Sequence, residues 1–473
     1  MASRKNLSSL DSVFLYLETP EVPMHIGGLS FVHLPNEYKG SFYEAFKQII
    51  GQRLHLSPVL TQKLANPRPL LQHTEWIEDA EFDLNHHVLR VSVAPGSDRA
   101  AVNQAVARIH SQLLDRTRPL WEVHIAEGMQ NGEAAFYFRL HHAGVDGGAV
   151  AALYGVMFDT TQEPRAVAQP EPASDAPAES GGGLISLLAG TYEQMLEQSM
   201  KLPSIWMEAA TTANSLAASL LDPKLMLDLP KVVAPRTPFN GTISAERSFA
   251  TASVSLARCK TLAAAAGGKI NDVVLALSSG AVRSYLAEKG ALPDRSLTAM
   301  VPISVREAGG GDEGNQVFAM MCPLASDIAD PKRRLETIIA DSTTAKMLSG
   351  RVKSLILQVA EMSVVGQPMI VQVLGALYNL ANAGNVLPPM GNITVSNVPG
   401  PKQRLFAAGG ELLSLYPVSA VALGLGLNVT VLSYRGELDF GLTAAANLVP
   451  DVDRIANEIP AELETLEGSF GLT

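Results

Sequence analysis

The sequence predicts an α/β protein made of two lobes with mixed β-sheets, joined by a linker and helices. At about 100–200 residues per domain, a chain of 473 residues has room for two or three domains. Runs of β-branched and aromatic residues alternate with helical patterns in both halves of the chain. A stretch rich in Pro, Ala, Ser and Gly at 163–183 separates these halves.

This stretch sets the expected domain limits. We expect an N-terminal lobe over 1–162, a flexible linker with connecting helices over 163–231, and a C-terminal lobe over 232–473. Within the connection, residues 184–221 favour helices, interrupted at Pro203. These helices either pack on one lobe or lie on a lipid surface.

In the first lobe, residues 134–140 (AAFYFRL) predict a strand that leads directly into His141 and His142. Residues 147–159 have the spacing of a short apolar helix. The two histidines should therefore lie at a strand end, just before a helix.

In the second lobe, residues 255–266 predict a helix that ends at Gly267-Gly268, and another helix runs from about Asn271 to Lys289. Alternating or clustered β-branched and aromatic residues predict strands at 297–305, 317–324, 393–397, 428–433 and 438–443.

Composition excludes several classes of protein. The net charge of −11 argues against nucleic-acid binding, which needs clustered Lys and Arg. The two cysteines, Cys259 and Cys322, leave no disulfide framework and no cysteine-based zinc site. The polar N-terminus lacks the apolar run of a secretion signal, so we expect a cytoplasmic protein.

Residues 362–401 form a stretch without any charged side chain. About 20 apolar residues span a bilayer, but Gly, Asn and Pro interrupt this run. We expect a helix that is either buried or in contact with a membrane, followed by a loop and a strand.

The segment HHAGVDG at 141–147 is the strongest candidate for chemistry. A metal site is disfavoured because adjacent histidines on a strand point to opposite faces. The sequence contains no GxSxG motif, which would indicate a serine nucleophile. A general-base histidine remains, since a neutral imidazole can take a proton from a hydroxyl. The second pair, His86-His87, lacks such a setting, and we expect it to be structural.

HHAGVDG resembles the HHxxxDG motif of the CoA-dependent acyltransferase superfamily, which includes chloramphenicol acetyltransferase, plant alcohol acyltransferases and peptide-synthetase condensation domains. Further segments together resemble the bacterial wax ester synthase/acyl-CoA:diacylglycerol acyltransferases: LDSVFLYLETPEVPMHIGGL at 10–29, PLW at 119–121, NDVVLA at 271–276, PISVR at 302–306, SNVPGP at 396–401 and LSYRGELDFGLTAAANLVPD at 432–451. The DFGWG motif of plant acyltransferases is DFGLT here, at 439–443.

The resemblance implies two lobes like chloramphenicol acetyltransferase, with an active-site tunnel between them. It also implies transfer of a long-chain acyl group from acyl-CoA to a fatty alcohol, giving a wax ester, or to diacylglycerol, giving triacylglycerol. Acyl-CoA would be a substrate, and no metal or other cofactor is expected. The open alternatives are a related enzyme acting on a smaller alcohol and a non-catalytic lipid-surface protein.

We expect His142 to act as the base during direct attack on the thioester, with Asn271 as the oxyanion donor or, alternatively, an ordinary helix N-cap. By resemblance, Asp146 anchors the loop through an arginine, either Arg306 or Arg118. The other residues of the predicted site are His141, as packing or support, and the substrate-binding set Gly147, Pro119, Leu120, Trp121, Ser396 and Asn397.

The expected partners are acyl-CoA, a long-chain alcohol and diacylglycerol, with contact to the inner membrane or to lipid inclusions left open. An acidic protein needs local positive charge to bind the phosphates of CoA. The candidate cations are Arg116, Arg118, Lys402 and Arg404.

Overall fold

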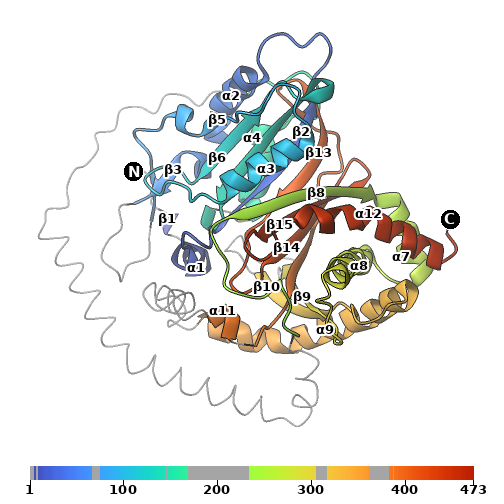
Figure 1. Ribbon diagram of the computed structural model, residues 1–473. Helices are drawn as coiled ribbons and strands as arrows, with labels where there is room; N and C mark the ends of the chain where they lie inside the picture. Colours follow the sequence, from blue (N-terminus) through green and yellow to red (C-terminus); the bar gives the residue numbers. More distant parts are fainter. Residues whose placement is uncertain are drawn as a thin grey trace, which may run out of the picture.

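The computed structural model describes residues 5–6, 9–65, 75–144, 147–168, 234–304, 317–361, 383–386 and 388–472. Within these residues the chain forms two six-stranded mixed sheets and a smaller three-stranded sheet. Helices cover both large sheets, which confirms the predicted α/β class with two lobes (Figure 1).

The first lobe is built on a sheet with the strand order β12-β13-β2-β7-β6-β5. Its N-terminal strands β2, β7 and β6 are antiparallel, while β5 is parallel to β6. The bounds are β2 (His25–His33), β5 (Val88–Arg90), β6 (Trp121–Ala126) and β7 (Glu133–His141). The small sheet consists of β1 (Lys5–Asn6), β3 (Gln62–Leu64) and β4 (Glu75–Glu78).

Strand β7 is buried on both faces, which explains its continuous apolar sequence. Phe136 and Phe138 face a core shared with α2 (Phe42–Arg53) and α4 (Gly147–Met157). Tyr137 faces the opposite core, shared with α3 (Arg99–His110). Successive side chains of a strand point to opposite faces, so helices on both sides require apolar residues throughout.

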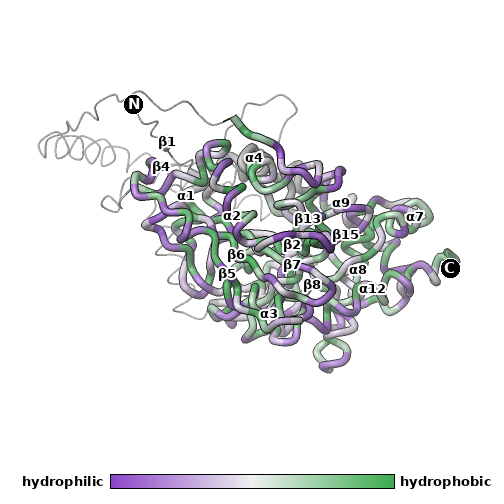
Figure 2. Tube along the Cα trace, turned by 90° about the horizontal axis from the view of Figure 1, so that it is seen from above, coloured by the Kyte–Doolittle hydropathy of each residue, from purple (hydrophilic) through white to green (hydrophobic). Residues whose placement is uncertain are grey.

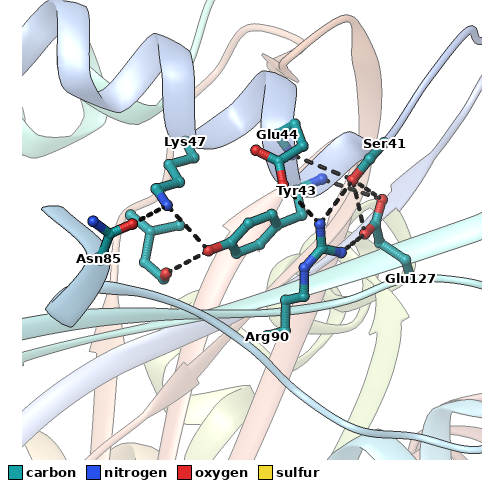
Figure 3. A network of polar contacts seen from close by, with 8 residues as sticks. Ser41, Tyr43, Glu44, Lys47, Asn85, Arg90 and Glu127 are labelled. Atoms are coloured by element: carbon teal, nitrogen blue, oxygen red, sulfur yellow. Dashed lines mark hydrogen bonds and ion pairs between the residues drawn. The ribbon is translucent and has the colours of Figure 1, made fainter.

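A polar network fixes the start of α2 against the sheet (Figure 3). Ser41 caps the helix by accepting a hydrogen bond from Glu44 N, and its hydroxyl donates to Glu127. The Glu127 carboxylate also accepts from Tyr43 N and, at 2.6 Å, from Arg90. The Arg90 guanidinium lies 3.8 Å above the Tyr43 ring. One carboxylate therefore joins the helix start to strand β5.

The second lobe is built on a sheet with the order β10-β9-β11-β14-β15-β8. Strands β9, β11 and β14 are parallel, and the remaining pairs are antiparallel. The bounds are β8 (Arg247–Ser255), β9 (Thr298–Ser304), β10 (Val317–Pro323), β11 (Ile393–Val398), β14 (Leu427–Tyr434) and β15 (Glu437–Ala445).

Helix α8 (Ile270–Glu288) lies in the centre of the second lobe. Every residue from Asp272 to Val282 is buried, as expected for a helix that is covered on all sides. It packs against the neighbouring helices of this lobe and against β11. These helices are α7 (Leu256–Ala266), α9 (Pro331–Glu361) and α12 (Val452–Ser469).

The two lobes exchange a segment. Strands β12 (Phe406–Ala407) and β13 (Gly410–Val418) come late in the chain but complete the sheet of the first lobe. Strand β13 pairs antiparallel with β2, and Figure 1 shows its orange ribbon beside the blue one of β2. The connection at 163–231 therefore does not separate the strands of one sheet from those of the other. The domain limits stay a prediction.

The elements predicted from the sequence are confirmed to within a residue or two. The helix ending at Gly267 is α7, with Gly267 in the left-handed conformation at φ 70°. The predicted helices at 184–221 and the helical part of 362–401 lie outside the described residues. Among the described residues, no helix has both the length and the apolar character to cross a membrane. Strand β1 and the end of α12 lie at opposite ends of the molecule in both views (Figures 1 and 2).

Candidate active site

The candidate site lies at the C-terminal end of β7, where the strand turns into the short helix η5 (His142–Gly144). The last residue of β7, His141, pairs with His25 of β2. Because β7 lies between β2 and β6, a rigid part of the sheet carries the turn. Gly147 begins α4. Asp146 lies outside the described residues.

His142 is partly exposed and stacks on Phe14 of α1 (Ser9–Leu17), with ring centroids 3.9 Å apart and ring planes at 18°. Its main-chain N–H donates to Met24 O at 2.8 Å. Burial lowers the pKa of His142 from 6.5 to about 4, and nearby His141 acts in the same direction. The imidazole is therefore neutral at pH 7 and able to accept a proton.

His141 is fully buried and faces a carboxylate. Its Nε2 atom lies 3.3 Å from Glu18 Oε1, and its Nδ1 atom accepts a hydrogen bond from Ala143 N at 3.1 Å. Nδ1 thus binds the main chain of the turn, while Nε2 lies beside the Glu18 carboxylate without a hydrogen bond to it. His141 thus supports the turn, and its ring is fully buried.

Glu18 follows directly after α1, and its side chain is 1% exposed. Oε1 accepts from Met24 N at 3.1 Å, and Oε2 accepts from Arg116 Nη2 at 2.8 Å. Burial alone would raise the pKa of Glu18, but His141, Arg116 and Met24 N together lower it to about 2. The carboxylate is therefore charged at pH 7.

The segment 119–121 lies beneath this turn. Leu120 is 1% exposed, and its carbonyl oxygen accepts from His141 N at 2.9 Å. Its side chain packs with Leu15 of α1 and with Ala143 of the turn. Pro119 is also buried. These contacts show how the segment supports the turn, whereas its contact with substrate stays a prediction.

Trp121 and the second histidine pair have structural contacts. The His87 ring lies between Phe82 and Trp121, with ring centroids 4.9 and 4.6 Å away. His87 Nδ1 donates to Trp121 O at 2.8 Å, and Trp121 Nε1 donates to Leu60 O at 2.9 Å. His86 is exposed. The expected structural role is confirmed for His87, while that of His86 stays a prediction.

Asn271 is the second residue of α8, and Lys269 occupies the N-cap position. Asp272 accepts from Lys269 N at 2.8 Å and from Ser342 Oγ at 2.7 Å, which fixes the helix start. The alternative in which Asn271 is itself the N-cap is therefore wrong. Among the described residues no contact joins Asn271 to His142, and the oxyanion role stays a prediction.

Ser396 and Asn397 lie on β11 beyond its pairing with β9, which involves Ile393 and Thr394. Both are hydrogen-bonded in register with β14 and are partly exposed. Their position at an open part of a central strand suits a substrate contact, which stays a prediction.

Of the two arginines expected to anchor Asp146, only Arg118 is among the described residues. Arg306 lies outside the described residues. The alternative partner, Arg118, forms an exposed ion pair with Asp115, at 3.7 Å. Arg116, a candidate for CoA phosphates, is instead bonded to Glu18 and to Leu15 O.

Metal binding finds no support within the described part of the chain, where no group of three or more His, Cys, Asp or Glu side chains could hold an ion. That the enzyme needs no cofactor stays a prediction.

Sequence profiles of one family match almost the whole chain. The wax ester synthase/diacylglycerol acyltransferase catalytic domain matches residues 7–274, and the C-terminal domain of the same family matches residues 313–467. The chain belongs to the wax ester synthase/diacylglycerol acyltransferase family. It is therefore an acyltransferase, as the HHxxxDG resemblance implied.

Relatives of this acyltransferase agree with the assignment. A Mycobacterium bovis protein, whose name assigns it diacylglycerol O-acyltransferase activity provisionally, is 33% identical over 98% of both chains. A Mycobacterium tuberculosis protein with a similar provisional name is also 33% identical, over 98% of this chain and all of that one.

Solved structures confirm the fold. The wax ester synthase/diacylglycerol acyltransferase from Marinobacter aquaeolei VT8 matches with a TM-score of 0.71 and 27% identity, over 99% of this chain and 100% of that one. The first condensation domain of the calcium-dependent antibiotic synthetase matches with a TM-score of 0.54 and 14% identity, over 98% and 97%. The predicted pair of chloramphenicol-acetyltransferase-like lobes is thus confirmed.

The sequence analysis of this acyltransferase missed Glu18. The segment 10–29 carried part of the family resemblance, but no residue in it was assigned to the site. One signal was present: Glu18 directly follows the apolar run FLYL and precedes Thr19-Pro20, so a carboxylate lies where the chain enters the interior. A buried carboxylate needs partners, and the site supplies them.

Proposed function

We propose that this acyltransferase moves a long-chain acyl group from acyl-CoA to a fatty alcohol or to diacylglycerol, with His142 as the general base. The names of the relatives support these two acceptors. The observation that carries the assignment of the base is the neutral, partly exposed imidazole of His142 at the end of a rigid strand.

In this mechanism the acceptor hydroxyl attacks the thioester carbonyl directly. His142 takes the hydroxyl proton as the new C–O bond forms, and it gives this proton to the CoA sulfur as the C–S bond breaks. Nδ1 of His142 is buried, so Nε2 is the nitrogen that substrate can reach. The oxyanion needs a donor, for which Asn271 remains the candidate.

Two assays test this function. Purified protein is incubated with palmitoyl-CoA and either hexadecanol or dipalmitoylglycerol, and the free thiol of CoA is followed. We expect acceptor-dependent thiol release, and a loss of about 10²–10⁴-fold in the rate for His142→Ala. Removing the exposed histidine in His86→Ala should leave the rate unchanged. Thiol release that no acceptor accelerates would exclude the proposed reaction, and an active His142→Ala would exclude the base.

We also propose that the protein works at a lipid surface, where its acceptors are found. Val386 and Met390 are 75% and 80% exposed, at and just after the short helix α11 (Ala383–Val386). Asn385 of this helix accepts a hydrogen bond from Thr242 N at 3.0 Å, which ties the segment to the body of the protein. Two large apolar side chains on a fixed segment suit insertion between lipids.

A further inference from the structure

We propose that Glu18 is a positioning residue that holds the turn carrying His142. The proposal rests on the proposed role of His142 as the base. Glu18 belongs to the segment after α1, more than a hundred residues before the histidines, yet its side chain is 1% exposed beneath them. Two routes of contacts lead from its carboxylate to the main chain around His142.

The first route passes through Met24. Glu18 Oε1 accepts from Met24 N at 3.1 Å, and Met24 O accepts from His142 N at 2.8 Å. A single residue therefore connects the carboxylate to the main chain of the base. Displacement of Met24 would move the nitrogen of His142 with it.

The second route passes through His141. The same Oε1 atom lies 3.3 Å from His141 Nε2, and His141 Nδ1 accepts from Ala143 N at 3.1 Å. Glu18 thus lies in contact with the ring of His141, and the other nitrogen of that ring binds the main chain of Ala143. The first route therefore fixes His142 itself, and the second fixes Ala143, which follows it.

The other carboxylate oxygen, Oε2, binds an arginine rather than the turn. Oε2 accepts from Arg116 Nη2 at 2.8 Å, and this guanidinium also donates to Leu15 O at 2.7 Å. Arg116 compensates the buried charge and joins it to α1. Positioning and charge compensation are therefore divided between the two oxygens, so substitutions can separate them.

Two variants make this separation. Glu18→Gln keeps an oxygen at the Oε1 position for Met24 and His141 but faces Arg116 with an amide. Glu18→Asp keeps the charge but withdraws the carboxylate by one methylene. If positioning is the role, Gln retains more activity than Asp. If charge compensation of Arg116 were the role, Asp would retain more than Gln.

The same sheet supplies a matched control. Glu122 lies 2.7 Å from His124 Nε2 and 2.6 Å from Arg139 Nη2, so the residue types around it are the same. None of these contacts, among the described residues, involves the His142 turn. Glu122→Ala measures the loss of stability when a carboxylate with His and Arg partners is removed.

The experiment measures kcat, KM and Tm for wild type and for the Ala, Gln and Asp variants of Glu18. Palmitoyl-CoA and hexadecanol are the substrates, and His142→Ala and Glu122→Ala are run beside them. We expect Glu18→Ala to lower kcat about 10- to 100-fold with a smaller change in KM, because small misplacements of a base are costly. Glu18→Gln should recover most of kcat. Glu122→Ala should lower Tm while kcat stays within about twofold of wild type.

The outcomes separate this proposal from the proposed base. Suppose that His142→Ala is inactive. The positioning role would then be overturned, with the base left in place, if Glu18→Asp were more active than Glu18→Gln. It would also be overturned if the kcat of Glu18→Ala were no lower than that of Glu122→Ala. An active His142→Ala would overturn the base, and the positioning role with it.

Discussion

At the scale of single residues, burial sets the protonation state of the proposed base, and Phe14 is one of the residues that cover it. The two rings are nearly parallel, with centroids 3.9 Å apart, and burial is the main cause that lowers the pKa of His142 to about 4. A base with this pKa is unprotonated throughout the neutral range. We therefore expect kcat/KM to show no loss from His142 protonation between pH 6 and 8, and to fall only toward pH 4.

Phe14→Ala should move this acid limb. Without the ring, water reaches the imidazole, and its pKa rises toward the ordinary value of 6.5. The limb of kcat/KM should then shift upward by about one pH unit. Phe82→Ala is the control, because Phe82 stacks in the same way on the structural His87. A pH profile of Phe14→Ala that coincides with that of wild type would show that the stack does not control the base.

The sequence predicted His142 but not Glu18, and the reason is physical. His142 stands in a local motif, in which small residues and a nearby acid leave few structural explanations. The role of Glu18 comes from contacts with Arg116 and His141, which lie about a hundred residues away along the chain. Local patterns show that a carboxylate will be buried, but not which residues it meets.

At the scale of elements, the DFG segment at 439–441 joins β15 of the second lobe to β13 of the exchanged pair. Asp439 Oδ2 accepts from Leu415 N at 2.8 Å, and Oδ1 accepts from Ser253 Oγ at 2.6 Å. A Cβ atom on Gly441 would lie 1.7 Å from Pro417 O, so only glycine allows this approach. Asp439 and Gly441, two of the three positions that this chain shares with the DFGWG motif, therefore hold β13 against β15.

Asp439 makes this junction sensitive to pH. Burial raises its pKa from 3.8 to about 6, although bonds from Leu415 and Ser253 oppose the shift. The folded state thus favours the protonated carboxyl. The resulting stability of the folded state is fully present below pH 3.8 and is lost as the pH rises through 6. Relative to wild type, Asp439→Asn should become more stable by ~3 kcal/mol from pH 4 to pH 7.

Urea unfolding of both proteins at several pH values checks this expectation. Asp451→Asn is a control of opposite sign. Burial would raise the pKa of Asp451, but Tyr285 and Lys289 lower it below the ordinary value. This variant should therefore lose stability relative to wild type as pH rises. Equal pH dependence of wild type and Asp439→Asn would contradict the assignment.

The elements that were predicted from the sequence have nearly the right limits, whereas the partners that they pack against could not be predicted. Periodicity and the glycines at 267–268 placed α7 and α8 to within a residue. Strand β13 was not among the predicted strands, and a strand pattern in LLSLYPV would not have shown which sheet it joins. The pairing of β13 with β2, a strand far earlier in the chain, decides that question.

At the scale of the whole molecule, the strand exchange fixes the two lobes relative to each other. Strand β13 pairs with β2, and β2 pairs with β7, which carries the histidines. The proposed base is thus attached to both lobes. The exposed apolar residues Val386 and Met390 lie on the second lobe, next to β11 with its predicted substrate contacts. This arrangement suits an enzyme that takes apolar substrates from a lipid surface.

The double variant Val386→Ser/Met390→Ser tests the lipid surface. Burying a large apolar side chain contributes about 1.5–3 kcal/mol, so we expect flotation with dioleoylphosphatidylcholine vesicles to weaken at least about tenfold. The rate with diolein in vesicles should fall as well, while the rate with hexanol in solution should not. Leu472→Ser is the control, since Leu472 is an exposed apolar residue just after the end of α12, on a different segment. With a net charge of −11, the protein should bind no better when phosphatidylserine is added. Flotation of the double variant equal to that of wild type would place the lipid contact elsewhere.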